Sequence, residues 1–357
     1  MTTARQRTLL PSETPRSLLD ADGRATGGEL PADDVLLELH RRMVVGRRFD
    51  TQATALTRQG RLAVYPSSRG QEACQVGSVL ALSEQDWLFP TYRDSVALVT
   101  RGVDPVQTLT LLQGGWHLGY DPHEYRIGPQ CTPLATNTLH AVGMAHAARL
   151  KGEDAVTLVL LGDGATSEGD THEALNFAGV WRAPVVFLVQ NNGYAISVPM
   201  SKQNAAPSLA HKGIGYGIAS ELIDGNDVAA VHATVSEAVA AARSGAGPAL
   251  IEARTYRIES HTNADDATRY RETDEVAAWL ARDPIDRTER YLRSRGLLDD
   301  AREAAITEEA EAFAASLRER MNTDVEVDPR ELFAHVYAEP TAALREQAEL
   351  LDEELRS

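Results

Sequence analysis

The fold of this chain is decided by a stretch that begins AVTLVLL (Ala155–Leu161) and ends PVVFLVQ (Pro184–Gln190). Both runs are strand-sized and almost continuously apolar, which is typical of parallel strands that are buried on both faces. The residues between them, Glu168–Val180, are predicted to form a helix. Strands that alternate with helices in this way predict an α/β protein with a doubly wound parallel sheet.

The alternation continues on both sides of this stretch. A helix is predicted over Asn137–Leu150, and a further helix and strand over Val228–Ser244 and Pro248–Ala253. Closer to the N-terminus we expect a helix over Gln71–Leu82 and a strand end or loop at Trp87–Arg93.

The two ends of the chain have a different character from the middle. Residues 1–30 mix Pro, Ser, Gly and charges without a period and predict a flexible arm. The α/β domain is expected over residues 31–265. Residues 266–357 are expected to form a helical region that packs on partner subunits, with helices over Arg287–Leu297, Ala301–Met321 and Ala342–Leu355.

The composition is that of a globular protein and disfavours several functions. The chain has 357 residues, of which 43% are apolar and 24% charged, so it can bury a sizeable core. With 35 basic and 52 acidic residues its formal charge is −17, which disfavours nucleic-acid binding. The two cysteines, Cys74 and Cys131, cannot build a disulfide framework. No targeting segment or apolar run of about 20 residues is visible, so we expect a cytoplasmic protein without a membrane segment.

Polar residues follow both decisive strands at the point where each strand ends. Gly162-Asp163-Gly164-Ala165 follows the first strand, and Asn191-Asn192-Gly193-Tyr194 follows the second. Each turn by itself is a common structural turn. Together they lie at the carboxyl ends of two strands, where open α/β sheets bind their ligands. The carboxylate of Asp163 and the amide oxygen of Asn192 are suitable ligands for Mg²⁺ or Ca²⁺, which can bridge to a phosphate.

These residues carry a family resemblance. Gly162-Asp163-Gly164, 26 intervening residues and Asn191-Asn192 look like the thiamine diphosphate motif. The string over 161–197, LGDGATSEGDTHEALNFAGVWRAPVVFLVQNNGYAIS, resembles the E1 α subunits of 2-oxo acid dehydrogenase complexes. Further matches, covering about residues 33 to 345, are Gly70-Gln71-Glu72-Ala73, Thr91-Tyr92-Arg93-Asp94, Pro133-Leu134-Ala135-Thr136, Gly225-Asn226-Asp227 and Thr255-Tyr256-Arg257 with Ser260-His261.

The resemblance implies a thiamine diphosphate-binding fold and a set of site residues. Asp163, Asn192 and the backbone carbonyl of Tyr194 would bind Mg²⁺. His261 resembles a catalytic histidine in a mobile loop, where it would donate a proton or stabilise the transition state. The residues implied to contact the cofactor are Tyr92, Arg93, Thr132, Leu134, Gly162, Asp163, Gly164, Ala165, Gln190, Asn192, Tyr194, Ile196, Arg257 and His261.

The chain also departs from the family pattern. Gln190 stands where some relatives have Arg, so one diphosphate contact is weaker or comes from elsewhere. The segment 113–130 lacks a signature of the relatives, and His117 or His123 could replace it. A potassium site of some members is not carried over. We expect Glu72 to be structural, because the glutamate that activates thiamine belongs to the β subunit in this split family.

The implied reaction is the oxidative decarboxylation of a 2-oxo acid, followed by acyl transfer to the lipoyl group of an E2 subunit. The implied assembly is an α₂β₂ heterotetramer with an E1 β subunit. The sequence NNGYAIS (191–197) favours a branched-chain substrate of the 3-methyl-2-oxobutanoate type, with pyruvate and then acetoin as alternatives. Two other classes stay open: a non-catalytic homologue, and a nicotinamide-binding protein, although no G-x-G-x-x-G follows a strand.

Overall fold

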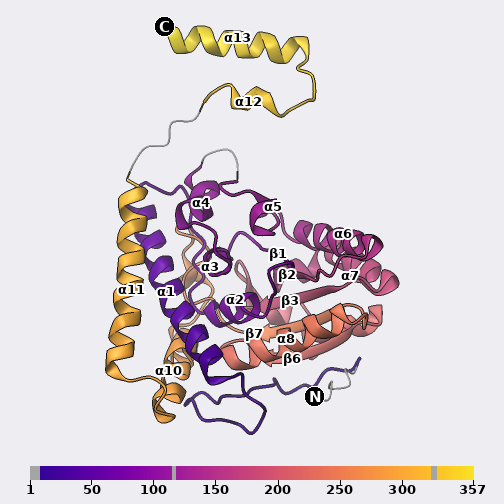
Figure 1. Cartoon of the computed structure of the whole chain (residues 1–357), viewed down its shortest axis with the longest axis vertical. Coiled ribbons are helices and arrows are strands. Elements are labelled where there is room, and N and C mark those ends of the chain that lie inside the picture. Colours follow the sequence, from indigo (N-terminus) through magenta and orange to yellow (C-terminus); the bar gives the residue numbers. More distant parts are fainter. Residues whose placement is uncertain (1–8, 115–117, 323–327) are drawn as a thin grey trace. The chain divides into compact units, whose positions relative to one another are not determined.

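The structure, a computed structural model, describes residues 9–114, 118–322 and 328–357 (Figure 1). They belong to two compact units, Met1–Arg318 and Glu319–Ser357, which are described separately. In the first unit, five parallel strands form one sheet in the order β1-β2-β3-β7-β6. Their bounds are Trp87–Phe89 (β1), Thr157–Gly162 (β2), Val185–Asn191 (β3), Ala219–Asp224 (β6) and Ala249–Arg254 (β7). The prediction of an α/β protein with a parallel sheet is confirmed.

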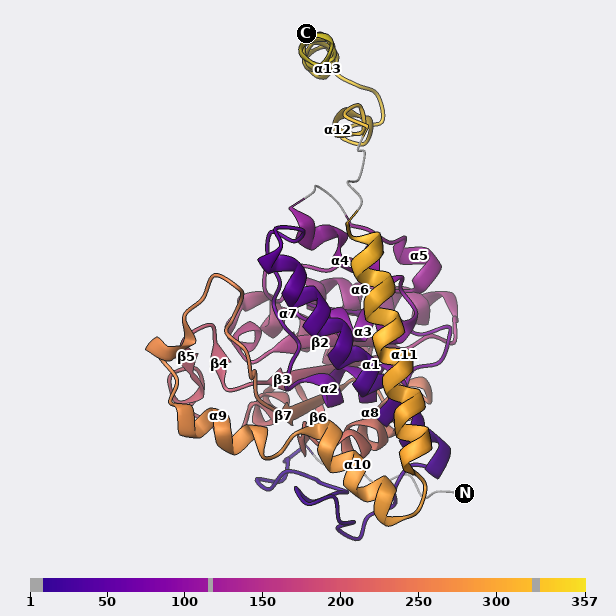
Figure 2. The same cartoon turned by 90° about the vertical axis from the view of Figure 1, so that its left-hand side faces the viewer.

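Helices cover both faces of this sheet, and a short antiparallel hairpin follows β3 (Figures 1 and 2). The hairpin consists of β4 (Tyr194–Ala195) and β5 (Val198–Pro199). The α-helices of the first unit are α1 (Asp33–Arg58), α2 (Glu72–Val79), α3 (Ser95–Arg101), α4 (Pro105–Leu109), α5 (Pro122–Tyr125), α6 (Thr136–Lys151), α7 (Gly169–Trp181), α8 (Val228–Arg243), α9 (Thr273–Leu280), α10 (Pro284–Ser294) and α11 (Asp300–Arg320).

The strands are apolar on both sides because each side meets its own core. Leu158 and Leu160 of β2 pack into a core with α2, α3 and α8. Val159 and Leu161 point the other way, into a core with α6 and α7. The chain moves in one direction along the sheet from β2 to β3 and in the opposite direction from β6 to β7. Because both crossovers are right-handed, this reversal places α8 on the face opposite α6 and α7.

The predicted elements around the two decisive strands are all present within a few residues of their expected ends. The sequence analysis missed β6, whose sequence ASELID carries three polar side chains in six residues. β6 is an edge strand, and its burial alternates instead of being continuous. A continuous apolar run is therefore a good signal for central strands and a poor one for edges.

The N-terminal segment differs in part from the flexible arm predicted over residues 1–30. Arg16 pairs in parallel with Ile223 of β6 and so covers the exposed edge of the sheet. The buried carboxylate of Asp227 accepts hydrogen bonds from the backbone N–H groups of Leu18 and Leu19, at 2.6 and 2.7 Å. The same carboxylate caps the N-terminus of α8. Residues 16–26 are thus held against the sheet.

The helices after residue 265 belong largely to the first compact unit, so that unit extends well beyond the domain boundary expected there. α1 and α11 run side by side (Figure 2), with the rings of Phe49 and Phe313 6.2 Å apart. The second unit contains the end of α11, α12 (Glu331–Ala334) and α13 (Ala342–Arg356). None of the helices in the described ranges combines the length and apolar character that crossing a membrane requires.

Candidate active site

The turn after β2 presents a buried carboxylate. Asp163 is only 1% exposed, and its Oδ2 accepts a hydrogen bond of 2.7 Å from the side-chain amide of Gln203. Burial raises the pKa of Asp163, while the hydrogen bond from Gln203 opposes the rise. The carboxylate thus has a neutral hydrogen-bond donor beside it, and the arrangement favours binding of a cation.

The turn after β3 presents an amide beside this carboxylate. Asn192 Oδ1 accepts the backbone N–H of Tyr194 at 3.3 Å, and the backbone N–H of Asn192 lowers the pKa of Asp163. Its neighbour Asn191 turns to the other face, where it donates to Glu252 at 2.8 Å. The two asparagines therefore differ in function, and Asn192 alone belongs with Asp163.

A chain of buried amides links Asn192 to the next part of the site. Asn192 Nδ2 donates to Gln71 Oε1 at 3.0 Å, and Gln71 Nε2 donates to Gln190 Oε1 at 3.1 Å. Gln190 Nε2 then donates to Asp94 Oδ1 at 2.7 Å. Asp94 is fully buried, and burial raises its pKa. This series of hydrogen bonds fixes the orientation of the Asn192 amide, and it engages both the oxygen and the nitrogen of the Gln190 amide.

Two arginines converge on His261 from separate segments. Arg93 donates to His261 Nδ1 at 3.0 Å and to its backbone carbonyl at 2.9 Å. Arg257 lies 3.4 Å from the same ring nitrogen and donates to the carbonyl of Ile196 at 2.9 Å. Both arginines are at most 5% exposed, and Nε of Arg257 is buried without a hydrogen-bond partner among the described residues.

The electrostatics of this cluster favour an anion. Burial, and then the charges of Arg93 and Arg257, lower the pKa of His261 to about 4. Burial and Arg93 also lower the pKa of Arg257. Asp265, which accepts the backbone N–H of His261 at 2.8 Å, opposes this effect on His261. The cluster holds more positive than negative charge, and a phosphate group would relieve the imbalance.

Comparison with known proteins agrees with this geometry. Residues 40–322 match a family described as the dehydrogenase E1 component. This chain belongs to that family. A 3-methyl-2-oxobutanoate dehydrogenase subunit alpha from Mycobacterium tuberculosis (strain ATCC 25618 / H37Rv) is 47% identical over 346 residues, 96% of this chain and 94% of the relative. A pyruvate dehydrogenase E1 component subunit alpha from Staphylococcus aureus (strain Mu50 / ATCC 700699) is 37% identical over 342 residues, 94% and 92% of the two chains. The family resemblance predicted from the motifs is confirmed.

The glycines of the E1 motif leave room beside Asp163. A Cβ on Gly162 would meet no atom within 4 Å, whereas one on Gly164 would lie 2.8 Å from the Cβ of Ala195. The first glycine therefore leaves open space, and the second allows the turn to pack against β4. Ala165, which follows, is buried.

Further residues implied by the E1 resemblance form an exposed apolar rim. Leu134 is 40% exposed and Ile196 is 55% exposed, and Thr132 is also exposed. Ile196 has a φ of 56°, a left-handed conformation that is rare for a β-branched residue. Tyr92 is partly buried, and its ring lies 6.1 Å from that of His261.

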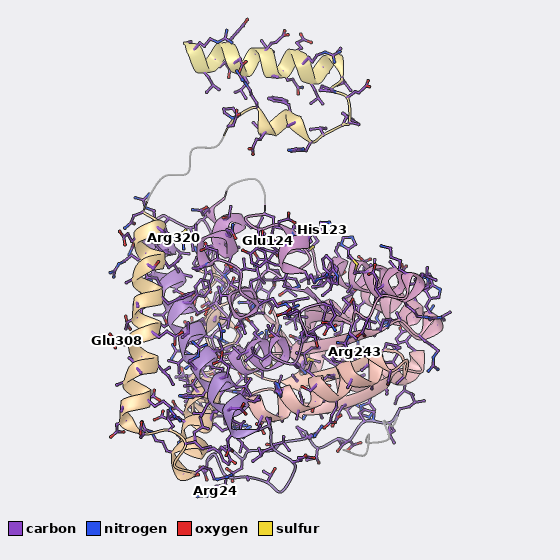
Figure 3. The ribbon with its side chains drawn as sticks, in the orientation of Figure 1. Arg24, His123, Glu124, Arg243, Glu308 and Arg320 are labelled. Atoms are coloured by element: carbon purple, nitrogen blue, oxygen red, sulfur yellow. The ribbon has the colours of Figure 1, made fainter. Side chains whose placement is uncertain are left out.

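The two histidines considered for the missing E1 signature are not brought into the site by any described contact. His123 is exposed on α5 at the surface of the first unit (Figure 3), and its ring packs edge-on against Trp87. His117 lies outside the described residues. Glu72 is fully buried, paired with Arg47 and bonded to the backbone N–H of Gly70, as expected of a structural residue.

Three residues that are hydrogen-bonded to the candidate site residues were not singled out from the sequence. Gln71 and Asp94 were noted only as letters of matching motifs, and Gln203 was not noted at all. The third lies in an irregular loop after η3 (Met200–Lys202), where no periodic pattern exists to draw attention to it. The two glutamines carry no charge signal in the sequence, and for all three residues only the structure reveals what they contact.

The donor set fits a magnesium ion bridged to a phosphate. No group of three or more His, Cys, Asp or Glu side chains in the described parts of the chain could hold a metal by itself. One carboxylate, one amide oxygen and a backbone carbonyl are the oxygen ligands that Mg²⁺ takes when phosphate and water complete its shell. Asp163, Asn192 and Tyr194 carry groups of these kinds, and the charge of Arg257 acts on the Asp163 carboxylate.

Proposed function

We propose that this E1 family member is the α subunit of a branched-chain 2-oxo acid dehydrogenase, and that it binds thiamine diphosphate with Mg²⁺. The observation that carries the proposal is a buried carboxylate, Asp163, within the electrostatic reach of the buried Arg257, whose guanidinium shares His261 with the buried Arg93. Burial raises the pKa of Asp163, and the charge of Arg257 opposes this rise. A metal diphosphate has both the cation and the anion that such a site requires.

In this proposal Asp163, Asn192 and the carbonyl of Tyr194 hold Mg²⁺. Arg93 and Arg257 bind the diphosphate with their guanidinium forks, together with Tyr92 and the backbone of 162–165. Gln190 supports this contact indirectly, because its amide is engaged with Gln71 and Asp94. The bound thiazolium would supply the electron sink that allows a 2-oxo acid to lose CO₂.

His261 acts as a neutral hydrogen-bond donor. Its pKa of about 4 keeps the imidazole uncharged at neutral pH. Because the Arg93 guanidinium donates to Nδ1, the ring proton is on Nε2. His261 can therefore donate from Nε2 to a developing negative charge without bringing a third positive charge into the cluster.

The exposed rim points to a partner. Leu134 and Ile196 are apolar and exposed beside the site, and exposed apolar side chains grouped at a site mark an interface. We infer that an E1 β subunit covers this rim, completes the cofactor site with its own glutamate, and forms an α₂β₂ heterotetramer. We expect the helical residues of 266–357 to contribute to the same assembly, and a lipoyl-bearing E2 to receive the acyl group.

The choice of substrate rests on similarity. The branched-chain relative from Mycobacterium tuberculosis is 47% identical and the pyruvate relative from Staphylococcus aureus 37% identical, over nearly the same share of this chain. We therefore infer that the substrate is a branched-chain 2-oxo acid of the 3-methyl-2-oxobutanoate type. A pocket distinguishes substrates by only ~1–3 kcal/mol per methylene group. The preference is therefore measured as the ratio of the turnover rates of the two 2-oxo acids.

The test is to assay the chain alone and co-expressed with the E1 β subunit of its genome, using thiamine diphosphate, Mg²⁺ and an artificial electron acceptor. We expect turnover of 3-methyl-2-oxobutanoate by the co-expressed enzyme and none by the chain alone. Faster turnover of pyruvate than of 3-methyl-2-oxobutanoate would overturn the inferred substrate preference. Turnover by the chain alone would overturn the inference that a β subunit completes the site. Absence of metal-dependent thiamine diphosphate binding in a folded co-expressed enzyme would overturn the proposal.

A further inference from the structure

The side chain of Gln203 has an unusual pair of environments. Its Nε2 donates to Asp163 Oδ2 at 2.7 Å and to the carbonyl of Val198 at 2.9 Å. Its Oε1 is buried and has no hydrogen-bond partner among the described residues. The direction of the amide is fixed by chemistry, because the reversed amide would place Oε1 against two acceptor oxygens.

Buried polar atoms in proteins are nearly always paired, so an unpaired one needs an explanation. Oε1 belongs to the same amide that holds Asp163, the carboxylate assigned above to the metal. Mg²⁺ gives up its water reluctantly and keeps several water molecules when it binds to few protein ligands. Those molecules are hydrogen-bond donors, which is what Oε1 lacks.

We propose that Gln203 is a positioning residue of the metal centre. Its Nε2 fixes the orientation of the Asp163 carboxylate, and its Oε1 accepts a hydrogen bond from a water molecule bound to the metal. Residues of this kind, which hold a ligand and do not touch the metal, strongly influence metal affinity. The inference rests on the proposed function, because it takes Asp163 to be the metal ligand.

A purely structural role would have another signature. Through Val198 the Gln203 amide also ties the loop to the β4–β5 hairpin. If this tether were its only task, removing the amide would lower thermal stability and leave metal affinity unchanged. The two roles can therefore be separated by measuring both quantities on the same variants.

The experiment uses the co-expressed enzyme stripped of metal and supplied with saturating thiamine diphosphate. Mn²⁺ is titrated as the probe, and free Mn²⁺ is measured by electron paramagnetic resonance. Gln203→Met preserves the size of the side chain and removes both polar atoms, so we expect Mn²⁺ affinity to fall by about 10–100-fold. Gln203→Ala removes the same two polar atoms together with most of the side chain, so we expect Mn²⁺ affinity to fall in this variant as well.

The matched control is Asn204→Ala, one residue further on, whose amide donates to the exposed carbonyl of Ala206 and to no other atom among the hydrogen bonds of the described residues. Its Mn²⁺ affinity should equal that of the wild type. Wild-type affinity in Gln203→Met would overturn the inference and leave the proposed function intact. If Gln203→Met does not fold, wild-type Mn²⁺ affinity in a folded Gln203→Ala enzyme would overturn it instead. Failure of the wild type to bind Mn²⁺ would overturn both.

Discussion

The candidate site has two halves that are built in opposite ways. The anionic half, Asp163 with Asn192, follows directly from two adjacent strands, and neutral amides hold it in place. The cationic half, Arg93 and Arg257 around His261, comes from segments far apart in the sequence and is held by backbone carbonyls.

Neither half neutralises the other by a direct contact among the described hydrogen bonds and ion pairs. Burial acts on both in the same sense, because it disfavours charge: it raises the pKa of Asp163 and lowers those of Arg257 and His261. A protein that leaves opposite buried charges side by side but unpaired is less stable than it could be. A ligand that carries both a cation and a polyanion restores the balance, and the comparison can be tested one half at a time.

The largest effect is expected in the anionic half. In Asp163→Asn the metal would lose the charged ligand that we propose for it. Removing one member of a buried charged pair costs about 2–5 kcal/mol, which corresponds to about 30-fold or more in affinity. We expect metal-dependent binding of thiamine diphosphate to weaken by at least this factor, measured by titration calorimetry on the co-expressed enzyme.

The same variant should not weaken the unliganded fold. Burial raises the pKa of Asp163 in the folded protein above its value in the unfolded chain. The unliganded wild type is therefore most stable at low pH, where the carboxyl is protonated in both states. It loses this stability as the pH rises through the folded pKa, because the buried group must then ionise. The neutral amide avoids this loss, and Asp163→Asn should be at least as stable as the wild type at pH 7, with the gain vanishing under acid conditions. Lower stability at pH 7, seen in urea unfolding without metal, would contradict the account.

A smaller effect is expected in the cationic half. Arg257→Gln removes one charged hydrogen-bonding group, each of which contributes about 1.5–3 kcal/mol, or about 10- to 150-fold in affinity. We expect this loss for inorganic pyrophosphate, measured by calorimetry in the presence of Mg²⁺. Mn²⁺ affinity without phosphate should stay near that of the wild type, because Arg257 is not a metal ligand.

The control for this variant is Arg69→Gln. Arg69 is 41% exposed and pairs at the surface with Glu259 at 2.9 Å, so its loss should have little effect on pyrophosphate. If both variants weaken pyrophosphate binding equally, pyrophosphate is held by the general positive charge of this surface, and Arg257 is not part of a defined binding site.

His261 reports the field between the two arginines. We expect its imidazole to titrate at a pKa of about 4, as followed by NMR of histidine-labelled enzyme. A neutral histidine with a depressed pKa makes the fold more stable as pH rises between about 4 and 6.5, because the unfolded chain binds the extra proton in that range. Arg93→Gln should move the pKa part of the way towards 6.5, since burial, the larger cause, remains.

Added pyrophosphate should raise the same pKa further by placing negative charge beside the ring. A pKa at or above 6.5 in the unliganded enzyme would show that the cationic half is not formed in solution.

The two halves also differ in how far the sequence could predict them. Asp163 and Asn192 were found from local pattern, because buried parallel strands bring their carboxyl ends to one edge of the sheet. Arg93, Arg257 and His261 came only from resemblance to a family, since nothing local brings residues 93 and 257 together. The hydrogen bonds that place them depend on the path of the loop over residues 255–271.

The supporting residues show the limit of sequence patterns. Gln71, Asp94 and Gln203 lie in a helix cap, a turn and an irregular loop. Their roles depend on which atoms they meet across the fold. The edge strand β6 and the bound segment 16–26 were missed for the same reason, because each is specified by its partner and has no strong period of its own.

The smallest effect is expected where the two halves meet. Ile196 lies in the β4–β5 turn, after Asn192, and its carbonyl accepts from Arg257 at 2.9 Å. Its left-handed backbone, with φ 56°, costs an L-residue about 1–2 kcal/mol. Asn tolerates this conformation, and because the Ile196 side chain is 55% exposed, little burial is lost on replacing it. Ile196→Asn should therefore gain about 1 kcal/mol in urea unfolding of the unliganded enzyme, whereas Ser197→Asn, at a neighbour without positive φ, should gain nothing. If Ile196→Asn instead lost stability, the turn would not be strained, and its geometry would come from packing of the apolar side chain against the rim.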